Sequence, residues 1–438
     1  MMDALYSIFR QHPVVSTDTR HLPQGCIFFA LKGASFDGNA FAAQALENGA
    51  AVAVIDNPQY CLDDRYFLVP DVMEALQQLA THHRMQFDIP VIAIGGSNGK
   101  TTTKELVSSV LSSHYPCHFT KGNLNNHIGV PLTLLSMPAE TEVAVIEMGT
   151  NQPGDIELLC RIAKPTHGLL TNIGKEHLEG FGSLAGVKKA EGELYQYLAR
   201  HAGCVFLNMS EKYLPAMARR NKPRIEYRES AALNPNNGSI EVQLLQDMPF
   251  VEAAFLSDEG PRVEVRTHLF GRHNFNNIMT AIALGIYFKV PAAVIKSALE
   301  SYRPSNNRSQ IIPYGSNTVL LDAYNANPSS MEPALKSLQA MSAKYKIAIL
   351  GDMLELGENS EKEHNAILRF ASKMGLDQIV LVGKEFGKTP YQRYGALHFP
   401  DNTAAKAWLD AQQLEHALIL VKGSRGVRLE SVVLSPKS

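Results

Sequence analysis

The sequence predicts an α/β protein with parallel sheets in about three domains. Three observations support this. The chain has 438 residues, and one domain takes up roughly 150 residues on average. Hydrophobic residues make up 45% of the chain, which is enough for several buried cores and argues against disorder. Short apolar runs alternate with amphipathic stretches along almost the whole length.

The apolar runs have the length and composition of buried parallel strands. They are rich in Val, Ile and Leu and do not alternate with polar residues, as expected where helices cover both faces of a sheet. The runs lie at 51–56, 90–96, 142–149, 167–174, 318–323, 346–352, 378–383 and 417–423. The segments between them have helical spacing, which groups Leu106, Val107, Val110 and Leu111 on one face. This alternation predicts α/β domains.

Two positions indicate domain boundaries. One lies near residues 87–90, between a helical stretch and a strand, and the other is the polar, Pro- and Asn-rich segment 301–310. The predicted domains are therefore 1–88, 89–304 and 305–438. Residues 224–266 contain a turn-rich NPNNGS and short β-like segments, and they predict a small antiparallel excursion within the middle domain.

Composition excludes several classes of protein. With Lys+Arg 41 and Asp+Glu 43, the net charge is −2, so we expect no nucleic-acid partner and no anionic-membrane binding. The five cysteines contain no C-x-x-C pair, which fits a reducing compartment. No apolar stretch reaches the about 18 residues of a membrane span, and the N-terminal segment does not resemble a signal peptide. The sequence favours a cytoplasmic multidomain enzyme.

The most informative motif is a glycine-rich loop, GGSNGKTT, at 95–102. It follows a predicted strand and opens a predicted helix, where backbone N–H groups and the helix dipole hold phosphate groups. Lys100 would reach the β- and γ-phosphates, and the Thr101 hydroxyl would bind Mg²⁺. The general pattern G-x-x-x-x-G-K-S/T requires Gly where this chain has Ile94. The predicted phosphate-binding residues are Gly96, Ser97, Asn98, Gly99, Lys100, Thr101 and Thr102. Kinases, GTPases, motors and ligases all remain open on this motif alone.

Later strands end in residues that could bind a metal ion beside the phosphates. Glu147 ends one apolar run, and His177 lies in a glycine-punctuated loop between Glu176 and Glu179. Glu191 follows His177 by fourteen residues. Ligands bind at the carboxyl ends of strands in open α/β sheets, and Mg²⁺ prefers carboxylate oxygens. Each of these residues is also compatible with an ordinary solvent-facing position.

Several segments together resemble the Mur ligases. They are GGSNGKTTT, KGNLNNHIGVPLTLL, EMGTNQPGDI, HLEGFGSLAGV, GRHNFNNIMTAIA, NNRSQ, LDAYNANPSSMEPAL, GDMLELG and KGSRGVRLE. The resemblance runs from about residue 14 to about residue 430, and the shortened phosphate loop is the form found in this family. HLEGFGS and AYNANPSSM resemble the family members that add D-alanyl-D-alanine to UDP-N-acetylmuramoyl-tripeptide.

The resemblance implies an architecture and a reaction. The first domain would bind the UDP-sugar, the central P-loop domain would be a parallel-sheet ATPase, and the third would be Rossmann-like. The tripeptide carboxylate would attack the γ-phosphate of ATP to give an acyl phosphate, which the amine of D-Ala-D-Ala then attacks. This is a step of peptidoglycan synthesis and implies a monomer with ATP and Mg²⁺. Another Mur ligase, a folylpolyglutamate synthetase or a regulatory P-loop NTPase are the alternatives.

The resemblance also implies roles for single residues. Thr101 and Glu147 would hold one Mg²⁺, and Glu147 and His177 a second. Asn274 would contact the adenine, Asp322 the ribose and Arg308 the phosphates. The UDP-substrate residues implied are Ser16, Thr17, Asp18, Arg20, Lys32, Gly33, Asn125 and Asn126. Tyr324, Asn325 and Asn327 would face the dipeptide or the γ-phosphate.

The chain departs from the family at Glu191. Many Mur ligases have a lysine fourteen residues after the metal-binding histidine, and its carbamate orients the second Mg²⁺. A glutamate there supplies a similar anionic group on a shorter side chain without CO₂. In an alternative register, Lys188 or Lys189 would serve. No residue decides whether the third residue of the tripeptide is meso-diaminopimelate or L-lysine.

Overall fold

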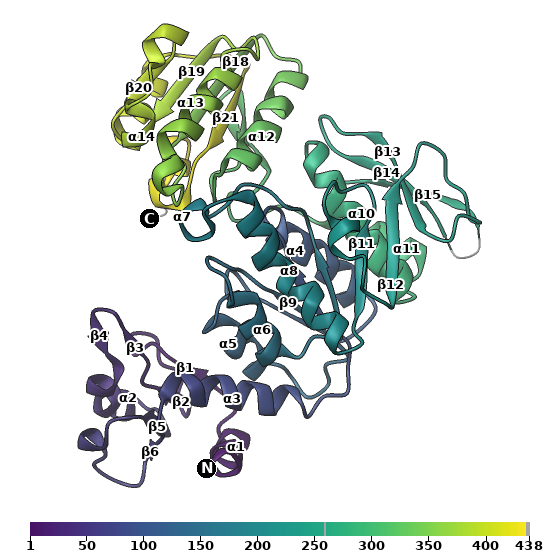
Figure 1. Cartoon of the computed structure of the whole chain (residues 1–438). Coiled ribbons are helices and arrows are strands. Elements are labelled where there is room, and N and C mark those ends of the chain that lie inside the picture. The colour runs from purple at the N-terminus through teal and green to yellow at the C-terminus, as the bar shows by residue number, and fades with distance from the viewer. Residues whose placement is uncertain (258–259, 435–438) are drawn as a thin grey trace.

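The computed structural model describes residues 1–257 and 260–434. Its main sheets have four, nine and six strands and follow one another along the chain, each flanked by helices (Figure 1). The α/β class and the parallel sheets predicted from the sequence are confirmed. In the part of the chain that the structure describes, no helix is both long and apolar enough to cross a membrane.

The first sheet is parallel, with strand order β1-β2-β5-β6. Its strands are β1 (Val15–Ser16), β2 (Ile27–Phe29), β5 (Val52–Ile55) and β6 (Tyr66–Leu68). A hairpin of β3 (Lys32–Gly33) and β4 (Phe36–Asp37) projects from it, and the helices are α1 (Met2–Gln11), α2 (Ala42–Glu47) and α3 (Val72–Arg84). Asp71 caps α3 by accepting from the Glu74 N–H, and α3 packs on helices of the next unit.

The second sheet has the order β15-β14-β13-β12-β11-β10-β7-β9-β8. Its strands are β7 (Val91–Gly95), β8 (Cys117–Phe119), β9 (Val143–Glu147), β10 (His167–Leu170), β11 (Cys204–Asn208), β12 (Arg224–Glu229), β13 (Ile240–Gln246), β14 (Glu252–Leu256) and β15 (Arg262–Arg266). The strands are parallel from β8 through β13, and only β13, β14 and β15 pair antiparallel.

The predicted antiparallel excursion over 224–266 is therefore wrong in its first part. β12 extends the parallel sheet by pairing with β11, and β13 pairs parallel with β12. The turn-rich NPNNGS segment connects two parallel neighbours instead of closing a hairpin. Antiparallel pairing begins only between β13 and β14. These strands follow each other in the chain, and antiparallel neighbours can be joined by a short turn without a crossover.

Helices cover both faces of this sheet. On one face lie α4 (Lys100–Ser112), α10 (Arg272–Tyr287) and α11 (Ala292–Ser301). On the other lie α5 (Gly129–Leu135), α6 (Asp155–Ala163) and α8 (Leu184–Arg200). Alternate residues of β7 enter the two cores, since Ala93 packs with the second group and Ile94 with the first. Short helices α7 (Leu178–Phe181) and α9 (Leu214–Met217) flank α8.

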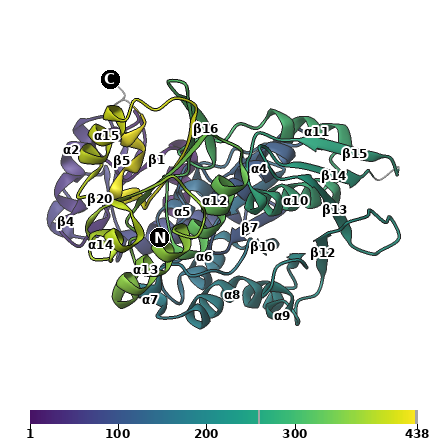
Figure 2. The ribbon, with the colours of Figure 1, turned by 90° about the horizontal axis from the view of Figure 1, so that it is seen from above.

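The third sheet has the order β16-β17-β21-β18-β19-β20, with β16 antiparallel and the rest parallel. Its strands are β16 (Gln310–Tyr314), β17 (Asn317–Leu321), β18 (Tyr345–Gly351), β19 (Gln378–Val382), β20 (Leu397–Phe399) and β21 (Ala417–Lys422). Helices α12 (Pro328–Ala340), α13 (Ser360–Ala371) and α14 (Lys384–Gly387) cover one face, and α15 (Asn402–Ala411) covers the other. Viewed from above, α7 lies beside α13 (Figure 2).

Each of the eight apolar runs forms a strand in a parallel ladder, namely β5, β7, β9, β10, β17, β18, β19 and β21. Residue 88 lies between α3 and β7, and residue 305 lies between α11 and β16.

Candidate active site

A cavity of about 790 Å³ lies between the second and third sheets. The central domain contributes the phosphate loop, Glu147 and His177, and the C-terminal domain contributes residues that follow β17. The predicted site residues that line it are Ser97, Asn98, Gly99, Lys100, Thr101, Thr102, Asn125, Asn126, Glu147, His177, Asn274, Arg308, Asp322, Tyr324, Asn325 and Asn327.

The phosphate loop joins the end of β7 to the start of α4. Gly96 and Gly99 have backbone φ angles of +109° and +82°, which residues other than glycine rarely adopt. A Cβ at Gly96 would also lie 2.4 Å from Thr171 Oγ1. The next loop along the sheet fixes the conformation, because the Asn98 N–H donates to Asn172 Oδ1 and Asn172 Nδ2 donates to the Asn98 carbonyl.

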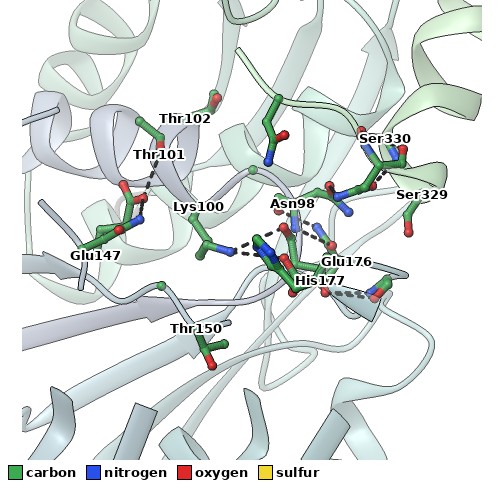
Figure 3. A pocket seen from close by; sticks show the side chains of 18 of the residues that line it. Asn98, Lys100, Thr101, Thr102, Glu147, Thr150, Glu176, His177, Ser329 and Ser330 are labelled. Atoms are coloured by element: carbon green, nitrogen blue, oxygen red, sulfur yellow. Dashed lines mark hydrogen bonds and ion pairs between the residues drawn. The ribbon is translucent and has the colours of Figure 1, made fainter. Parts of the chain in front are cut away.

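Lys100 turns back over its own loop. Its Nζ donates to the Gly96 carbonyl at 2.5 Å and lies 3.6 Å from Glu176 Oε2. Figure 3 shows Lys100 on the side of Glu176 and His177, with Thr101 facing Glu147. Burial alone would lower the pKa of Lys100, but the carboxylates of Glu176, Glu191 and Glu147 outweigh it and raise that pKa. The site thus holds a charged ammonium group ready for an anion.

Glu147 and Thr101 form a set of oxygen donors beside the loop. Glu147 Oε1 accepts from Thr101 Oγ1 at 3.1 Å and from Asn125 Nδ2 at 2.8 Å, while Oε2 is buried without a hydrogen-bond partner. An unpartnered buried carboxylate oxygen next to a hydroxyl fits Mg²⁺. Among the described residues, no three His, Cys, Asp or Glu side chains gather as a metal site, so phosphate and water oxygens would have to complete the coordination.

His177 lies at the domain interface. It precedes α7 with φ of +42°, and its Nδ1 lies 2.6 Å from Oε2 of Glu355 in the C-terminal domain. That hydrogen bond lowers the pKa of Glu355. Thr101 and Glu147, two other predicted metal ligands, pair with each other, whereas the His177 ring pairs with Glu355.

Glu191 lies beneath the phosphate loop and not in the lining of the cavity. It is fully buried on α8; Oε2 accepts from the Gly96 N–H at 2.7 Å, and Oε1 has no hydrogen-bond partner. Burial raises the pKa of Glu191 to about 8. Lys188 Nζ stacks 3.6 Å from the Tyr213 ring and Lys189 is exposed, so Glu191 is the member of this segment that reaches the loop.

The predicted nucleotide residues form a polar cluster where β17 ends. Asn274 is buried and donates to Phe270 O and Ser309 Oγ, and its Oδ1 accepts from Asn277. Its amide is therefore fully used within the protein. Arg308 lies 3.6 Å over the Tyr324 ring, and its Nε is buried without a hydrogen-bond partner.

Asp322 accepts from Lys422 Nζ at 2.5 Å. Burial would raise the pKa of Asp322, but the ammonium of Lys422 keeps it below its usual value. Beside this pair, burial lowers the pKa of His273 to about 4, so the ring is neutral.

The predicted UDP-substrate residues divide between two places. Asn125 and Asn126 line the cavity, where Asn126 Oδ1 also accepts from the Gly129 N–H at the start of α5. Ser16, Thr17, Asp18, Arg20, Lys32 and Gly33 belong to the first domain and lie outside the cavity. Arg20 pairs with Asp18 at 2.7 Å, and Lys32 pairs with Asp56 at 2.8 Å.

Three family descriptions match consecutive parts of the chain. They are "Mur ligase family, catalytic domain" over 13–84, "Mur ligase middle domain" over 94–285 and "Mur ligase, glutamate ligase domain" over 307–425. The UDP-N-acetylmuramoyl-tripeptide–D-alanyl-D-alanine ligase of Escherichia coli is 35% identical over 96% of this chain and 92% of its own length. The chain belongs to the Mur ligase family.

Other Mur ligases give the same result. The enzyme of that name from Bacillus subtilis is 33% identical over 96% of this chain and 92% of its own length. The crystal structure of MurF from Acinetobacter baumannii superposes with a TM-score of 0.84 at 31% identity, covering 95% of this chain and 92% of that one. MurF ligase from Thermotoga maritima in complex with ADP has a TM-score of 0.81 at 25% identity, covering 96% of both chains. The predicted family and three-domain Mur ligase architecture are confirmed.

Some residues of this Mur ligase site were not predicted. Glu355 and Lys422 reach it from the C-terminal domain, and each lies in a segment that supports the resemblance, GDMLELG or KGSRGVRLE. Asn327 was predicted to face the dipeptide or the γ-phosphate, but its contact was not: it donates from the start of α12 to Asn98 Oδ1 in the phosphate loop, which links the two domains. The motifs indicated that these segments are typical of the family, but they did not indicate which residue each side chain contacts.

Proposed function

We propose that this Mur ligase forms an amide bond between UDP-N-acetylmuramoyl-tripeptide and D-alanyl-D-alanine at the expense of ATP. The observation that carries the proposal is the cavity in which a charged Lys100 and an unpartnered Glu147 oxygen face the C-terminal domain. Full-length similarity to ligases of that specificity supports the choice of substrates. The reaction belongs to peptidoglycan synthesis, and we place it in the cytoplasm with a monomeric enzyme.

The first chemical step brings a carboxylate against a triphosphate, so negative charge must be neutralised. Lys100 would exchange its contact with the Gly96 carbonyl for the β- and γ-phosphates. Thr101 and Glu147, with His177 nearby, would hold Mg²⁺, which supplies positive charge to the transferred phosphoryl group. The γ-phosphoryl group leaves ADP and joins the tripeptide carboxylate, and the dipeptide amine then displaces phosphate from the acyl carbon.

The C-terminal cluster supports a role in nucleotide binding. Arg308 has a buried Nε without a hydrogen-bond partner, and its guanidinium group stacks on the Tyr324 ring. A guanidinium group can bind a phosphate through two parallel hydrogen bonds. Asp322 remains ionised, as a ribose-binding acid must. Asn274 would have to exchange one internal hydrogen bond to contact the adenine. Tyr324, Asn325 and Asn327 face the same cavity and would contact the dipeptide or the γ-phosphate.

We further propose that Glu191 replaces a carbamylated lysine. The Gly96 N–H donates to its carboxyl group beneath the loop. Because burial raises the pKa of that group to about 8, Glu191 would become fully anionic when the second Mg²⁺ binds nearby. Wild-type activity should then be the same in CO₂-depleted buffer and with added bicarbonate, and Glu191→Gln should lower turnover by about 10²-fold. Lys189→Ala is the matched control and should be fully active. Loss of activity on CO₂ depletion, with recovery in bicarbonate, would assign the role to a lysine.

Phosphate release from ATP with each substrate omitted in turn tests the proposed function. A ligase should release phosphate only with UDP-MurNAc-tripeptide and D-Ala-D-Ala together, and mass spectrometry should show the pentapeptide product. Turnover with folate and glutamate, or with D-Glu or L-Ala, would indicate another ligase. Phosphate release without either substrate would indicate a regulatory NTPase. Parallel reactions with meso-diaminopimelate and L-lysine tripeptides would identify the third residue.

A further inference from the structure

His177 and Glu355 meet across the interface between the central and C-terminal domains. His177 Nδ1 lies 2.6 Å from Glu355 Oε2, and the imidazole also lines the cavity. An ionised carboxylate only accepts hydrogen bonds, so Nδ1 must carry the proton. In a neutral ring the lone pair then lies on Nε2, which has no hydrogen-bond partner among the described residues, since the ring's polar contact is the one that Nδ1 makes with Glu355.

The backbone holds both residues in uncommon conformations. His177 has φ of +42° and Glu355 has φ of +62°, a region that costs energy for residues other than glycine. The two segments are also linked by a backbone hydrogen bond from the Glu179 N–H to the Glu355 carbonyl at 3.2 Å. Both uncommon conformations therefore lie where the two domains contact each other.

Helix α7 is anchored in both domains. Leu178 packs in the apolar cluster of the C-terminal domain with Met353 and Leu356, and Phe181 packs in the core of the central domain. Gly357, two residues after Glu355, would bring a Cβ within 3.3 Å of Glu179 Cα. The geometry of the His177–Glu355 pair therefore depends on how the C-terminal domain is seated on α7.

We propose that Glu355 is a positioning residue for His177. Its carboxylate accepts a hydrogen bond from Nδ1–H across the domain interface, and this fixes the tautomer that leaves Nε2 free to bind a divalent cation in the cavity. Carboxylate partners of this kind orient metal-binding histidines in many proteins. The metal ligand is then available only when the C-terminal domain is in place, which couples domain closure to metal binding. The part of this inference that concerns the metal ion rests on the proposed function, whereas the part that concerns the tautomer does not.

The first test uses the full chain without substrates. Two-bond ¹H–¹⁵N spectra of histidine-labelled protein report which ring nitrogen carries the proton, and His177→Gln identifies the signal. We expect Nδ1–H in the wild type and mostly Nε2–H in Glu355→Ala. Glu355→Gln keeps an acceptor oxygen and should retain the wild-type tautomer. Glu358→Ala, an exposed acid in the same loop, is the matched control.

The second test measures Mn²⁺ binding in the presence of ADP by electron paramagnetic resonance. Glu355→Ala should weaken Mn²⁺ binding by about 10-fold, the lower end of the effect of removing such a partner, and Glu355→Gln should restore most of it. An Nε2–H tautomer in the wild type would overturn the proposal. A tautomer or Mn²⁺ affinity that is unchanged in Glu355→Ala would also overturn it. These readouts need no ligation, so their failure is distinguishable from failure of the proposed function.

Discussion

The two domain interfaces of this Mur ligase differ in chemistry. The N-terminal and central domains share one apolar core, which runs from Leu5 in α1 through Leu79 in α3 to Leu134 in α5 and beyond. Arg84 at the end of α3 is buried and donates to the carbonyls of Ala163 and Phe87. Figure 1 shows α3 running beneath α5 and α6. We call this interface the apolar joint.

Several polar pairs link the central and C-terminal domains. Asn327 donates to Asn98 at 2.9 Å, Lys175 pairs with Glu363 at 2.6 Å, and His177 pairs with Glu355. Leu178 and Phe270 of the central domain also pack in the apolar cluster of the C-terminal domain, so the interface combines these polar pairs with a local apolar contact. We call this interface the polar joint.

The difference has a functional consequence. Separating the apolar joint would expose buried apolar surface to water, at a free-energy cost of about 25 cal/mol per Å². Hydrogen bonds and ion pairs at the polar joint can be replaced by hydrogen bonds to water at a small net free-energy cost. The cavity lies at the polar joint. We therefore expect the domain that carries the predicted UDP-substrate residues to stay fixed, and the domain that completes the nucleotide site to move.

The largest expected effect is at the phosphate loop, where the polar joint meets the chemistry. Lys100→Ala should lower ligation by about 10²-fold or more, since it removes on the order of 3 kcal/mol of charge stabilisation from the transition state. Turnover at saturating ATP is the measurement, with the thermal unfolding midpoint as a check on folding. Near-normal turnover would contradict the role given to Lys100.

Stability should be lost unequally at the two joints. Leu79→Ala leaves a cavity in the apolar joint and should lower the free energy of unfolding by about 2–5 kcal/mol. Ser329→Ala removes hydrogen bonds between Ser329 Oγ and the backbone of Lys175 at the polar joint and should cost about 1 kcal/mol. Urea unfolding of both variants gives the comparison. Equal losses would show that the joints do not differ as described.

The smallest effect is a pH dependence of the apolar joint. His83 lies among Tyr6, Phe9 and Phe87, and burial lowers its pKa, with His82 and His118 acting in the same direction. A histidine with a lowered pKa stabilises the fold above its unfolded pKa of 6.5, and this stability is lost as pH falls through the folded pKa.

The unfolding midpoint should therefore fall between about pH 7 and about pH 5. In His83→Gln the fall should be smaller by about 1 °C. His114→Gln, at an exposed histidine, should not change it. A fall in His83→Gln that matches the wild type would assign the pH dependence to other groups.

Local signals in the sequence predicted much of the fold. A buried parallel strand is apolar along its whole length, so runs such as 346–352 could be recognised as strands from composition alone. The phosphate loop could be recognised because its strand, glycines and helix lie within one short segment. β12 was misassigned because pairing partners are not encoded in a short strand. The contacts of Glu355 and Lys422 were not predictable for a related reason, since each partner lies at least 100 residues away in the chain.

We expect the C-terminal domain to move at the polar joint while the apolar joint stays fixed. Double electron–electron resonance measures both in one protein. One label pair uses the exposed native Cys61 with Gln196→Cys on α8, and the other uses Gln196→Cys with Lys373→Cys in a Cys61→Ser background. A nonhydrolysable ATP analogue with Mg²⁺ and UDP-MurNAc-tripeptide should shift or narrow the second distance and leave the first unchanged. An equal shift in the first distance, or no change in the second, would show that the C-terminal domain does not move in this way.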